Sequence, residues 1–254
     1  MGLSVPRAAP LRDRGSGPLA RALRTTALGR IPAGERGWAT RIEARRRELS
    51  SRDAVVGPSF ADRISAGDDE PQVPSIPVGG AAGWISLTPA WCAFLMRLVR
   101  ELGPRSCLEL GTGFGISTLY QAAALELNGA GTMTTVEGAP DYVPIAKEGF
   151  SAFGLDRRVE VEVGSITETL KEVAARSAPI EFAFVDADHT EEATLAQFDA
   201  MLPHLSDGAI LVFDDVRWER GGMVRAWQEI VRHGRVSLAL GMRRIGVAVV
   251  SGRR

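Results

Sequence analysis

The feature that most constrains the fold of this chain is a regular alternation of short apolar runs with longer amphipathic stretches, which begins after Pro89. Short apolar runs rich in β-branched and aromatic residues are typical of buried strands, whereas apolar residues spaced three and four apart indicate helices. Strands that alternate with helices form a parallel sheet that is covered by helices on both faces. The sequence therefore predicts an α/β fold with a doubly wound, mostly parallel sheet.

The expected elements follow one another from residue 89 to residue 250. A first helix should begin at Pro89 and end at Gly103-Pro104, a dipeptide that does not continue a helix. The expected strands are 106–110, 132–137, 158–163, 180–185 and 208–213, and the expected helices are 116–128, 140–153, 166–176, 191–205 and 222–233. Two final strands, 236–240 and 245–250, are joined by a short connection, which predicts a C-terminal antiparallel hairpin and a seven-stranded sheet.

Composition divides the chain into three parts. Residues 1–34 are rich in Arg, Gly, Pro and Ala without periodicity, and we expect a flexible, Arg-rich tail there. Residues 35–87 combine an amphipathic helix at 38–49 with a Gly- and Pro-rich stretch at 65–83. We interpret the helix as a cap on the domain or a homodimer contact, and the stretch as a linker or a lid over the site. Residues 88–254 then form the α/β domain.

The charge of the chain points to no nucleic-acid or membrane partner. The formal net charge is −1, although the first 53 residues hold twelve Arg against five acidic residues. So small a net charge gives no overall field that attracts nucleic acid or anionic lipid. The Arg-rich start resembles a transit peptide or a disordered bacterial extension, and it lacks the apolar stretch of a secretory signal. Cys92 and Cys107 fall in an expected helix and strand, so we expect free thiols and a cytoplasmic location.

A glycine-rich loop connects the first expected strand of the sheet to the next helix. Glycines at 111, 113 and 115 allow backbone amides to approach a ligand closely, and this loop lies where open α/β sheets bind their ligands. A dinucleotide-binding fingerprint would place glycines at 111, 113 and 116, but residue 116 is Ile. The spacing, with Glu109 ahead of the glycines, instead resembles motif I of the class I S-adenosylmethionine-dependent methyltransferases.

This resemblance implies a binding site for S-adenosylmethionine at the ends of the first three strands. Glu137 ends the second strand, where a carboxylate accepts hydrogen bonds from both ribose hydroxyls. A dehydrogenase would also place an acid there, so Glu137 alone does not separate the two classes. The dipeptide Gly164-Ser165 ends the third strand, where the family contacts the adenine. The expected cofactor-binding residues are Glu109, Gly111, Thr112, Gly113, Ser117, Glu137, Gly164, Ser165 and Asp186.

Acidic residues follow two further strands of the sheet. Asp186 and Asp188 come directly after one apolar strand, and Asp214-Asp215 follow the next. Because adjacent parallel strands end at one rim, we expect Asp186, Asp214 and Asp215 to converge. Three converging carboxylates raise one another's pKa values unless a cation compensates them. A hard, oxygen-binding ion such as Mg²⁺ would do so. We expect Asp188, by contrast, to cap the following helix, for which Thr190 is also a plausible N-cap.

The two acidic segments resemble a specific family. Val185-Asp186-Ala187-Asp188 together with Phe213-Asp214-Asp215-Val216-Arg217-Trp218 resembles the cation-dependent O-methyltransferases of the catechol and caffeoyl-CoA type. This resemblance implies that Asp186, Asp214 and Asp215 hold the divalent metal. Where the family usually has a Lys that deprotonates the substrate, this chain has His189, and a neutral imidazole can take that catalytic role. Trp218 matches an aromatic position of the family and is expected to wall the substrate pocket or to be a core residue.

Together these features predict an S-adenosylmethionine-dependent methyltransferase that acts on the hydroxyl of a small-molecule acceptor with the help of a divalent metal. Chelators should then abolish its activity. Three alternatives remain open. They are a metal-independent N- or C-methyltransferase with structural acids, a nicotinamide-dependent oxidoreductase, and a non-catalytic nucleoside-binding protein.

Overall fold

The fold is built on one seven-stranded sheet. The computed structural model describes residues 16–27, 31–57, 75–219 and 222–252. The strands are β3 (Ser106–Leu110), β4 (Thr132–Glu137), β5 (Val159–Val163), β6 (Ile180–Val185), β7 (Leu205–Phe213), β8 (Val236–Gly241) and β9 (Gly246–Val250). Their order is β5-β4-β3-β6-β7-β9-β8, with the first five strands parallel and β9 antiparallel to both of its neighbours. The predicted sheet and its C-terminal hairpin are therefore confirmed.

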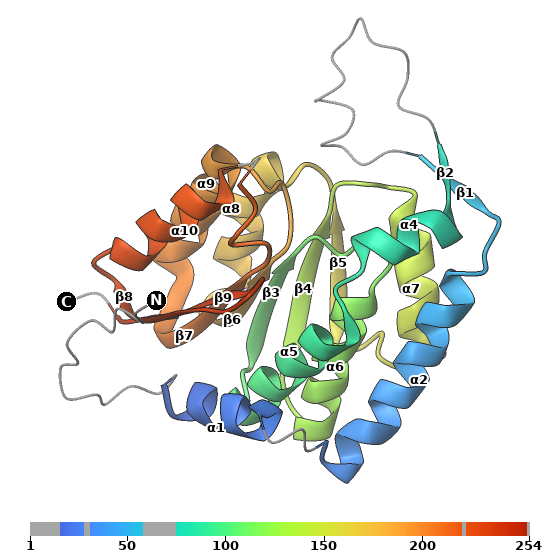
Figure 1. Ribbon diagram of the computed structural model, residues 1–254, viewed down its shortest axis with the longest axis horizontal. Coiled ribbons are helices and arrows are strands. Elements are labelled where there is room, and N and C mark those ends of the chain that lie inside the picture. Colours follow the sequence, from blue (N-terminus) through green and yellow to red (C-terminus); the bar gives the residue numbers. More distant parts are fainter. Residues whose placement is uncertain (1–15, 28–30, 58–74, 220–221, 253–254) are drawn as a thin grey trace, which may run out of the picture.

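Helices cover both faces of this sheet (Figure 1). One layer consists of α5 (Pro89–Leu102), α6 (Ile116–Asn128) and α7 (Tyr142–Ala152), and the other of α8 (Ile166–Arg176), α9 (Glu191–Met201) and α10 (Met223–Arg232). Within the described part of the chain, no single helix is long and apolar enough to cross a membrane. Taken together, α4 (Val78–Ile85) and α5 have sufficient length and apolar character, but they meet at a 60° bend.

Alternation along each strand produces two apolar cores, one on each side of the sheet. On β3, Cys107 packs into the core beneath α5 and α6, whereas Leu108 and Leu110 pack into the core beneath α8 and α9. On β6, Phe182 and Ala183 divide between the two cores in the same way. Side chains on neighbouring positions of a strand point to opposite faces, so a strand that is covered on both sides must be apolar throughout. This requirement explains the unbroken apolar runs in the sequence.

One helix ends earlier than the sequence predicts. The expected helix 191–205 ends at Met201, and a short 3-10 turn, η1 (Leu202–His204), leads directly into β7. Pro203 lies in this turn, and a proline lacks the N–H that an α-helix would need at that position. As a result β7 begins at Leu205, whereas the sequence predicted a strand from residue 208.

The N-terminal region is more ordered than expected. Residues 16–27 form helix α1 (Ser16–Ala27), although a flexible tail was predicted over 1–34; residues 1–15 and 28–30 lie outside the described part. Leu19 and Ala22 are buried in the core that α5 also lines. Arg21 pairs with Glu101 of α5 at 2.6 Å. The Arg-rich composition of this segment concealed a short apolar face, and burial of that face orders the helix.

Within the range 33–85, the described residues 33–57 and 75–85 form a layer on the outside of the domain. Helix α2 (Ala33–Leu49) runs along α6 and α7, and a two-residue strand pair, β1 (Val55–Val56) with β2 (Ile76–Pro77), leads to α4 (Figure 1). The linker or lid predicted at 65–83 is thus regular structure from residue 76, and its residues 65–74 lie outside the described part. A Cβ on Gly79 would lie 2.7 Å from the carbonyl oxygen of Ser50, so glycine allows α4 to approach the end of α2.

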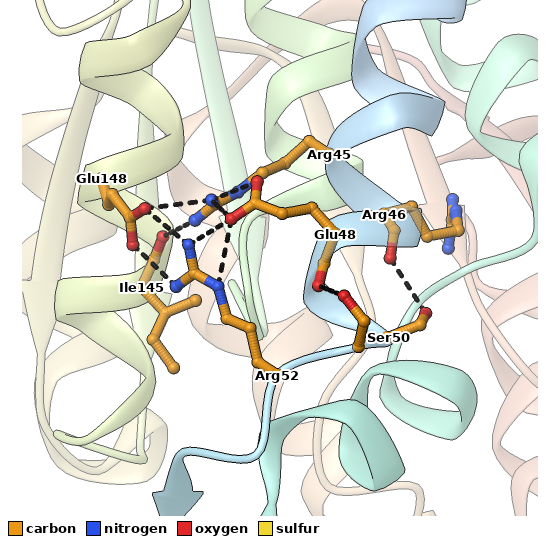
Figure 2. Close-up of polar contacts among 8 residues, drawn as sticks. Arg45, Arg46, Glu48, Ser50, Arg52, Ile145 and Glu148 are labelled. Carbon is orange, nitrogen blue, oxygen red and sulfur yellow. Dashed lines mark hydrogen bonds and ion pairs between the residues drawn. The ribbon is translucent and has the colours of Figure 1, made fainter.

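A network of four charged side chains fixes α2 against α7 (Figure 2). The guanidinium of Arg52 lies 2.5 Å from Glu48 and 2.6 Å from Glu148 of α7. Arg45, which is buried, lies 2.7 Å from Glu48 and 3.1 Å from Glu148, and it also donates to the carbonyl of Ile145. Networks of this kind stabilise more than isolated surface pairs, because each charge has two partners. Hydrogen bonds from Arg52 and Arg45 lower the pKa of Glu148 to about 2.

Removal of the Glu148 charge should therefore weaken the attachment of α2. We expect Glu148→Gln to lower the free energy of unfolding at neutral pH by about 0.5 kcal/mol, a modest value because solvent screens the half-exposed side chain. The pKa of Glu148 is lowered on folding, so this contribution is complete above its ordinary pKa of 4.5 and is lost as the pH falls toward about 2. Urea titrations at several pH values measure it. Glu229→Gln, on exposed α10, is the control, and equal effects of both substitutions would contradict the assignment.

Candidate active site

A cavity of about 620 Å³ lies at the carboxyl ends of β3, β4 and β6. This is the position where open α/β sheets bind their ligands, and the volume suits a nucleoside-sized molecule. The residues that line it are Trp84, Ile85, Ser86, Gly111, Thr112, Gly113, Phe114, Ile116, Ser117, Glu137, Gly138, Tyr142, Ile166, Asp186, Ala187, Asp188, His189, Asp215, Trp218 and Arg244. The glycine-rich loop and both acidic segments therefore meet at one cavity, as the sequence predicted.

The glycine-rich loop needs its glycines for packing as well as for access. Gly111, Gly113 and Gly115 have φ values of +92°, +54° and +82°, a region that favours glycine. A Cβ on Gly111 would lie 2.1 Å from the carbonyl oxygen of Asp186, and one on Gly115 would lie 2.9 Å from the ring of Phe150. The loop is thus held tightly between the end of β6 and α7. This packing leaves the backbone of Gly111 and Gly113 on the cavity wall.

Glu137 fixes the other side of the same loop. Its carboxylate accepts hydrogen bonds from the backbone N–H groups of Gly113 and Ala139, each at 2.7 Å. The side chain is almost completely buried, and this burial raises the pKa of Glu137 to about 7. A carboxylate has about four acceptor sites, so Glu137 retains acceptor capacity on the cavity wall. Ribose hydroxyls are donors of the kind that such a carboxylate accepts.

Glu109 has a different environment from the one expected for a cofactor ligand. It is fully buried and does not line the cavity. Its two oxygens accept hydrogen bonds from Ser117, Thr118, Gln121 and Thr135 at 2.5 to 2.8 Å. Burial raises the pKa of Glu109, and these four donors act in the opposite direction. Glu109 thus joins β3, β4 and α6 behind the loop, where it holds the site in shape.

The other predicted cofactor residues divide by position. Those that line the cavity are Gly111, Thr112, Gly113, Ser117, Glu137 and Asp186. Gly164 and Ser165 follow β5 as expected, but neither lines the cavity. The wall at the end of β5 is formed instead by Ile166, the first residue of α8. An apolar side chain at this point is suited to contact the face of a planar base.

His189 and Asp186 form a pair inside the cavity. Nε2 of His189 lies 3.4 Å from Oδ1 of Asp186, and both side chains line the wall. Burial raises the pKa of Asp186, as does the nearby charge of Asp214. Burial alone would lower the pKa of His189, but the contact with Asp186 and the charges of Asp214 and Asp215 outweigh it and raise that pKa. An imidazole in such surroundings accepts a proton readily.

Two acids on the wall have a left-handed backbone. Asp188 has φ +46° and Asp215 has φ +51°, and these are the non-glycine residues with positive φ in the described ranges. The predicted capping role of Asp188 is wrong, because the side chain of Thr190 accepts from the N–H of Ala193 and caps α9. Only the backbone carbonyl of Asp188 takes part, accepting from Thr190. Such conformations are concentrated at functional sites, where packing offsets their strain.

Asp214 is neutralised by an arginine from the C-terminal hairpin. Arg244, in the connection between β8 and β9, donates from Nε and Nη2 to the two oxygens of Asp214 at 2.6 and 2.5 Å. Nε of Arg244 also lies 3.1 Å from Asp215. The Asp214 side chain is completely buried, whereas Arg244 reaches the cavity wall. A paired, bidentate guanidinium is the arrangement that makes a buried carboxylate tolerable.

This arrangement does not fit the divalent metal that the sequence predicted. In the parts of the chain that the structure describes, no three His, Cys, Asp or Glu side chains form a group able to hold a metal ion. Both oxygens of Asp214 face Arg244, and Asp215 shares the same guanidinium. Converging carboxylates need a compensating cation, and Arg244 supplies one beside Asp214 and Asp215. The prediction of a metal on Asp186, Asp214 and Asp215 is therefore not confirmed.

Sequence reasoning also missed residues that reach the cavity from outside the sheet. Trp84, near the end of α4, is 64% exposed and lines the cavity wall. Trp218, which follows the acid pair, lines the wall as well and is 50% exposed, so of the two expected positions, pocket wall or core, the structure has the first. Exposed tryptophans at a cavity are common binding surfaces, because they offer a large apolar face. No local motif identified Trp84 or Arg244, since their roles depend on long-range packing.

Comparisons with known proteins agree with this geometry. A family model described as a methyltransferase domain matches residues 108–216, which include the glycine-rich loop and both acidic segments. A catechol O-methyltransferase from Mycobacterium tuberculosis is 30% identical over 170 residues, covering 66% of this chain and 74% of that protein. A catechol O-methyltransferase from Niastella koreensis is 30% identical over 133 residues, covering 52% of this chain and 58% of that protein.

Solved structures share the fold. An O-methyltransferase from Bacillus cereus, solved with SAH, has a TM-score of 0.59 at 22% identity and covers 93% of this chain and 91% of its own. The O-methyltransferase TomG from Streptomyces achromogenes, solved with SAM, has a TM-score of 0.59 at 22% identity. The match covers 78% of this chain and 92% of TomG. With the M. tuberculosis relative matched over most of its length, the assignment does not rest on fold alone. The chain belongs to the S-adenosylmethionine-dependent O-methyltransferase family.

Proposed function

We propose that this enzyme transfers a methyl group from S-adenosylmethionine to the hydroxyl of a small-molecule acceptor, with His189 as the general base. The observation that carries this proposal is the position of His189, which lines the same cavity as the glycine-rich loop and lies 3.4 Å from Asp186. A hydroxyl acceptor must lose its proton during methyl transfer, and an imidazole oriented by a carboxylate is suited to take it.

Each half of the cavity has its own task in this reaction. Glu137 and the backbone of Gly111 and Gly113 would hold the nucleoside, with the carboxylate accepting from the ribose hydroxyls. The bound cofactor supplies an electrophilic methyl group, and the acceptor oxygen forms its bond to that carbon as the carbon–sulfur bond breaks. His189 receives the hydroxyl proton on an imidazole nitrogen, and Asp186 stabilises the resulting imidazolium. Trp84 and Trp218 would enclose an apolar acceptor and limit the access of water.

The position of Arg244 favours a metal-independent form of this reaction. Its guanidinium already neutralises Asp214 and contacts Asp215, and it also reaches the cavity wall. Although its charge is balanced by these acids, a guanidinium N–H on the wall can donate a hydrogen bond to an acceptor oxygen that is losing its proton and so stabilise it. We therefore propose that Arg244 provides the electrostatic contribution that the sequence analysis assigned to a divalent metal. No step of the proposed reaction requires a metal ion.

Replacement of His189 tests the proposed base. We expect His189→Asn to lower kcat by about a hundredfold or more, because proton removal by a positioned base contributes rate enhancements of that size. The dissociation constant of S-adenosylhomocysteine, measured by calorimetry, should stay unchanged, since His189 acts on the acceptor. His204→Asn, on the η1 turn away from the cavity, is the matched control. Undiminished turnover in His189→Asn would show that His189 is not the general base.

The affinity for the cofactor should depend on the protonation of Glu137. Burial raises its pKa to about 7, and only the ionised carboxylate accepts from both ribose hydroxyls. We expect the dissociation constant of S-adenosylhomocysteine to rise by about tenfold between about pH 8 and about pH 6, as Glu137 gains its proton. Glu137→Gln should bind more weakly at the higher pH and should lose most of this dependence. A wild-type pH profile that the Gln variant reproduces would assign the titration to another group.

Chelation and the replacement of Arg244 test the source of the positive charge. Turnover of the wild-type enzyme should survive dialysis against EDTA, and titration with Mn²⁺ should show no binding near the acids. Arg244→Gln leaves Asp214 buried without its partner, so we expect a loss of about 3 kcal/mol in the free energy of unfolding together with a lower kcat. A wild-type enzyme that EDTA inactivates and Mg²⁺ restores would contradict the role given to Arg244 and favour the metal.

A further inference from the structure

A second cavity, of about 370 Å³, adjoins the first on the side of the C-terminal hairpin. It is lined by Trp91, Asp215, Arg217, Trp218, Arg243 and Arg244. Asp215, Trp218 and Arg244 line both cavities, so a molecule whose hydroxyl lies near His189 can extend from one into the other. The second cavity is thus the space available to the part of the acceptor that does not react.

The lining of this second cavity carries a net positive charge. Three arginines line it against a single carboxylate, that of Asp215. Arg244 is engaged by Asp214 and Asp215, whereas Arg217 and Arg243 form no ion pair with any carboxylate of the described residues. The whole chain has a net charge of −1, so this is a local concentration of positive charge. Unpaired arginines on a cavity wall are suited to bind carboxylate or phosphate oxygens.

The backbone holds these two arginines in place. The N–H of Val216 donates to the carbonyl of Arg244 at 2.9 Å, which joins the loop after β7 to the β8–β9 hairpin. Arg217 follows Val216, and Arg243 precedes Arg244, so both arginines lie directly beside this backbone junction. The ion pair of Arg244 with Asp214 strengthens the same junction. The backbone that carries the two arginines is therefore anchored at this junction.

The remaining wall of the cavity is aromatic. Trp218 is 50% exposed, and Trp91 of α5 packs edge-on against Phe94 with ring centroids 6.1 Å apart. Each indole offers an apolar face to a planar molecule, and guanidinium groups also stack well on such rings. A wall of two tryptophans and two arginines that have no ion pair among the described residues is complementary to an aromatic ring that carries a negative charge.

We infer that the acceptor is a hydroxylated aromatic compound with an anionic substituent, a carboxylate or a phosphate-type group, which Arg217 and Arg243 bind while the hydroxyl faces His189. This inference rests on the proposed O-methyl transfer and specifies its substrate class. The arginines act on binding, so they set the KM for anionic acceptors rather than the rate of the chemical step. Arg217 and Arg243 are therefore specificity residues.

The test compares acceptors that share the dihydroxyphenyl ring and differ in the charge and type of one substituent. The wild-type enzyme is assayed with 3,4-dihydroxybenzoate, with 3,4-dihydroxybenzamide and with the corresponding phosphonate. We expect the anionic compounds to have a kcat/KM at least about tenfold above that of the amide, since charge-assisted bidentate contacts have this effect. A preference for the carboxylate or for the phosphonate identifies which anion Arg217 and Arg243 bind better. Equal values for all three compounds would overturn the inference.

Substitution of the two arginines tests whether they cause the preference for anionic acceptors. Arg217→Gln and Arg243→Gln should each raise the KM for the anionic compounds by about tenfold and leave the amide unchanged. Arg157→Gln, an exposed arginine before β5, is the control for loss of surface charge. Variants that impair the acid and the amide equally would overturn the inference, because they would show a structural effect rather than an electrostatic one.

Measurements of acceptor binding test the arginine site independently of the proposed methyl transfer. Calorimetry of the same compounds with the complex of the enzyme and S-adenosylhomocysteine needs no methyl transfer. Tighter binding of the acid than of the amide, lost in Arg217→Gln and Arg243→Gln, supports the arginine site even if no catechol is methylated, and the missing turnover would then count against the proposed function alone. Equal binding of the acid and the amide would refute the arginine site while the O-methyl transfer remained intact.

Discussion

The buried charge of Asp214 is the constraint on which the acceptor side of this structure depends. A carboxylate that is completely buried at the end of β7 requires a cation, and leaving it unpaired costs about 3 to 5 kcal/mol. Arg244 meets this requirement only because β8 and β9 form a hairpin at the edge of the sheet, with β9 antiparallel to β7 and Gly246 opposite Phe213. The hairpin therefore completes the site electrostatically as well as extending the sheet.

The sheet could be predicted from the sequence because its signals are local. The central strands β3, β6, β7 and β9 are largely buried on both faces, so apolar runs mark these strands, and helical spacing marks the segments between them. The convergence of Asp186, Asp214 and Asp215 followed from parallel topology alone. Their counter-charge did not follow, because Arg244 lies about 30 residues further along the chain and its position depends on the hairpin register. Sequence reasoning recognised that a cation was needed and assigned the role to a metal.

The buried position of Glu109 could have been predicted from the sequence, although we expected this residue to bind the cofactor. Leu108 and Leu110 pack toward one face of the sheet, so the alternation of a strand sends Glu109 toward the other face, beneath α6. Helix α6 is almost entirely buried, yet Ser117 and Gln121 are polar. Polar residues on a buried helix need an internal partner, and the carboxylate of Glu109 provides it. Glu109, which resembles a ligand-binding acid in the motif, thus stabilises the elements that flank the glycine-rich loop.

The two halves of the site are constrained to different degrees. On the cofactor side, Gly111 has no room for a Cβ beside the carbonyl of Asp186. A substitution in this loop therefore requires a compensating change at the end of β6. On the acceptor side, Trp218, Arg217 and Arg243 are exposed side chains on connections, and their replacement leaves both cores untouched. Relatives that share the sheet at 22 to 30% identity can therefore keep one methyl donor while the acceptor surface diverges. For this chain it follows that cofactor chemistry is shared with the family, whereas acceptor choice has to be read from its own arginines and tryptophans.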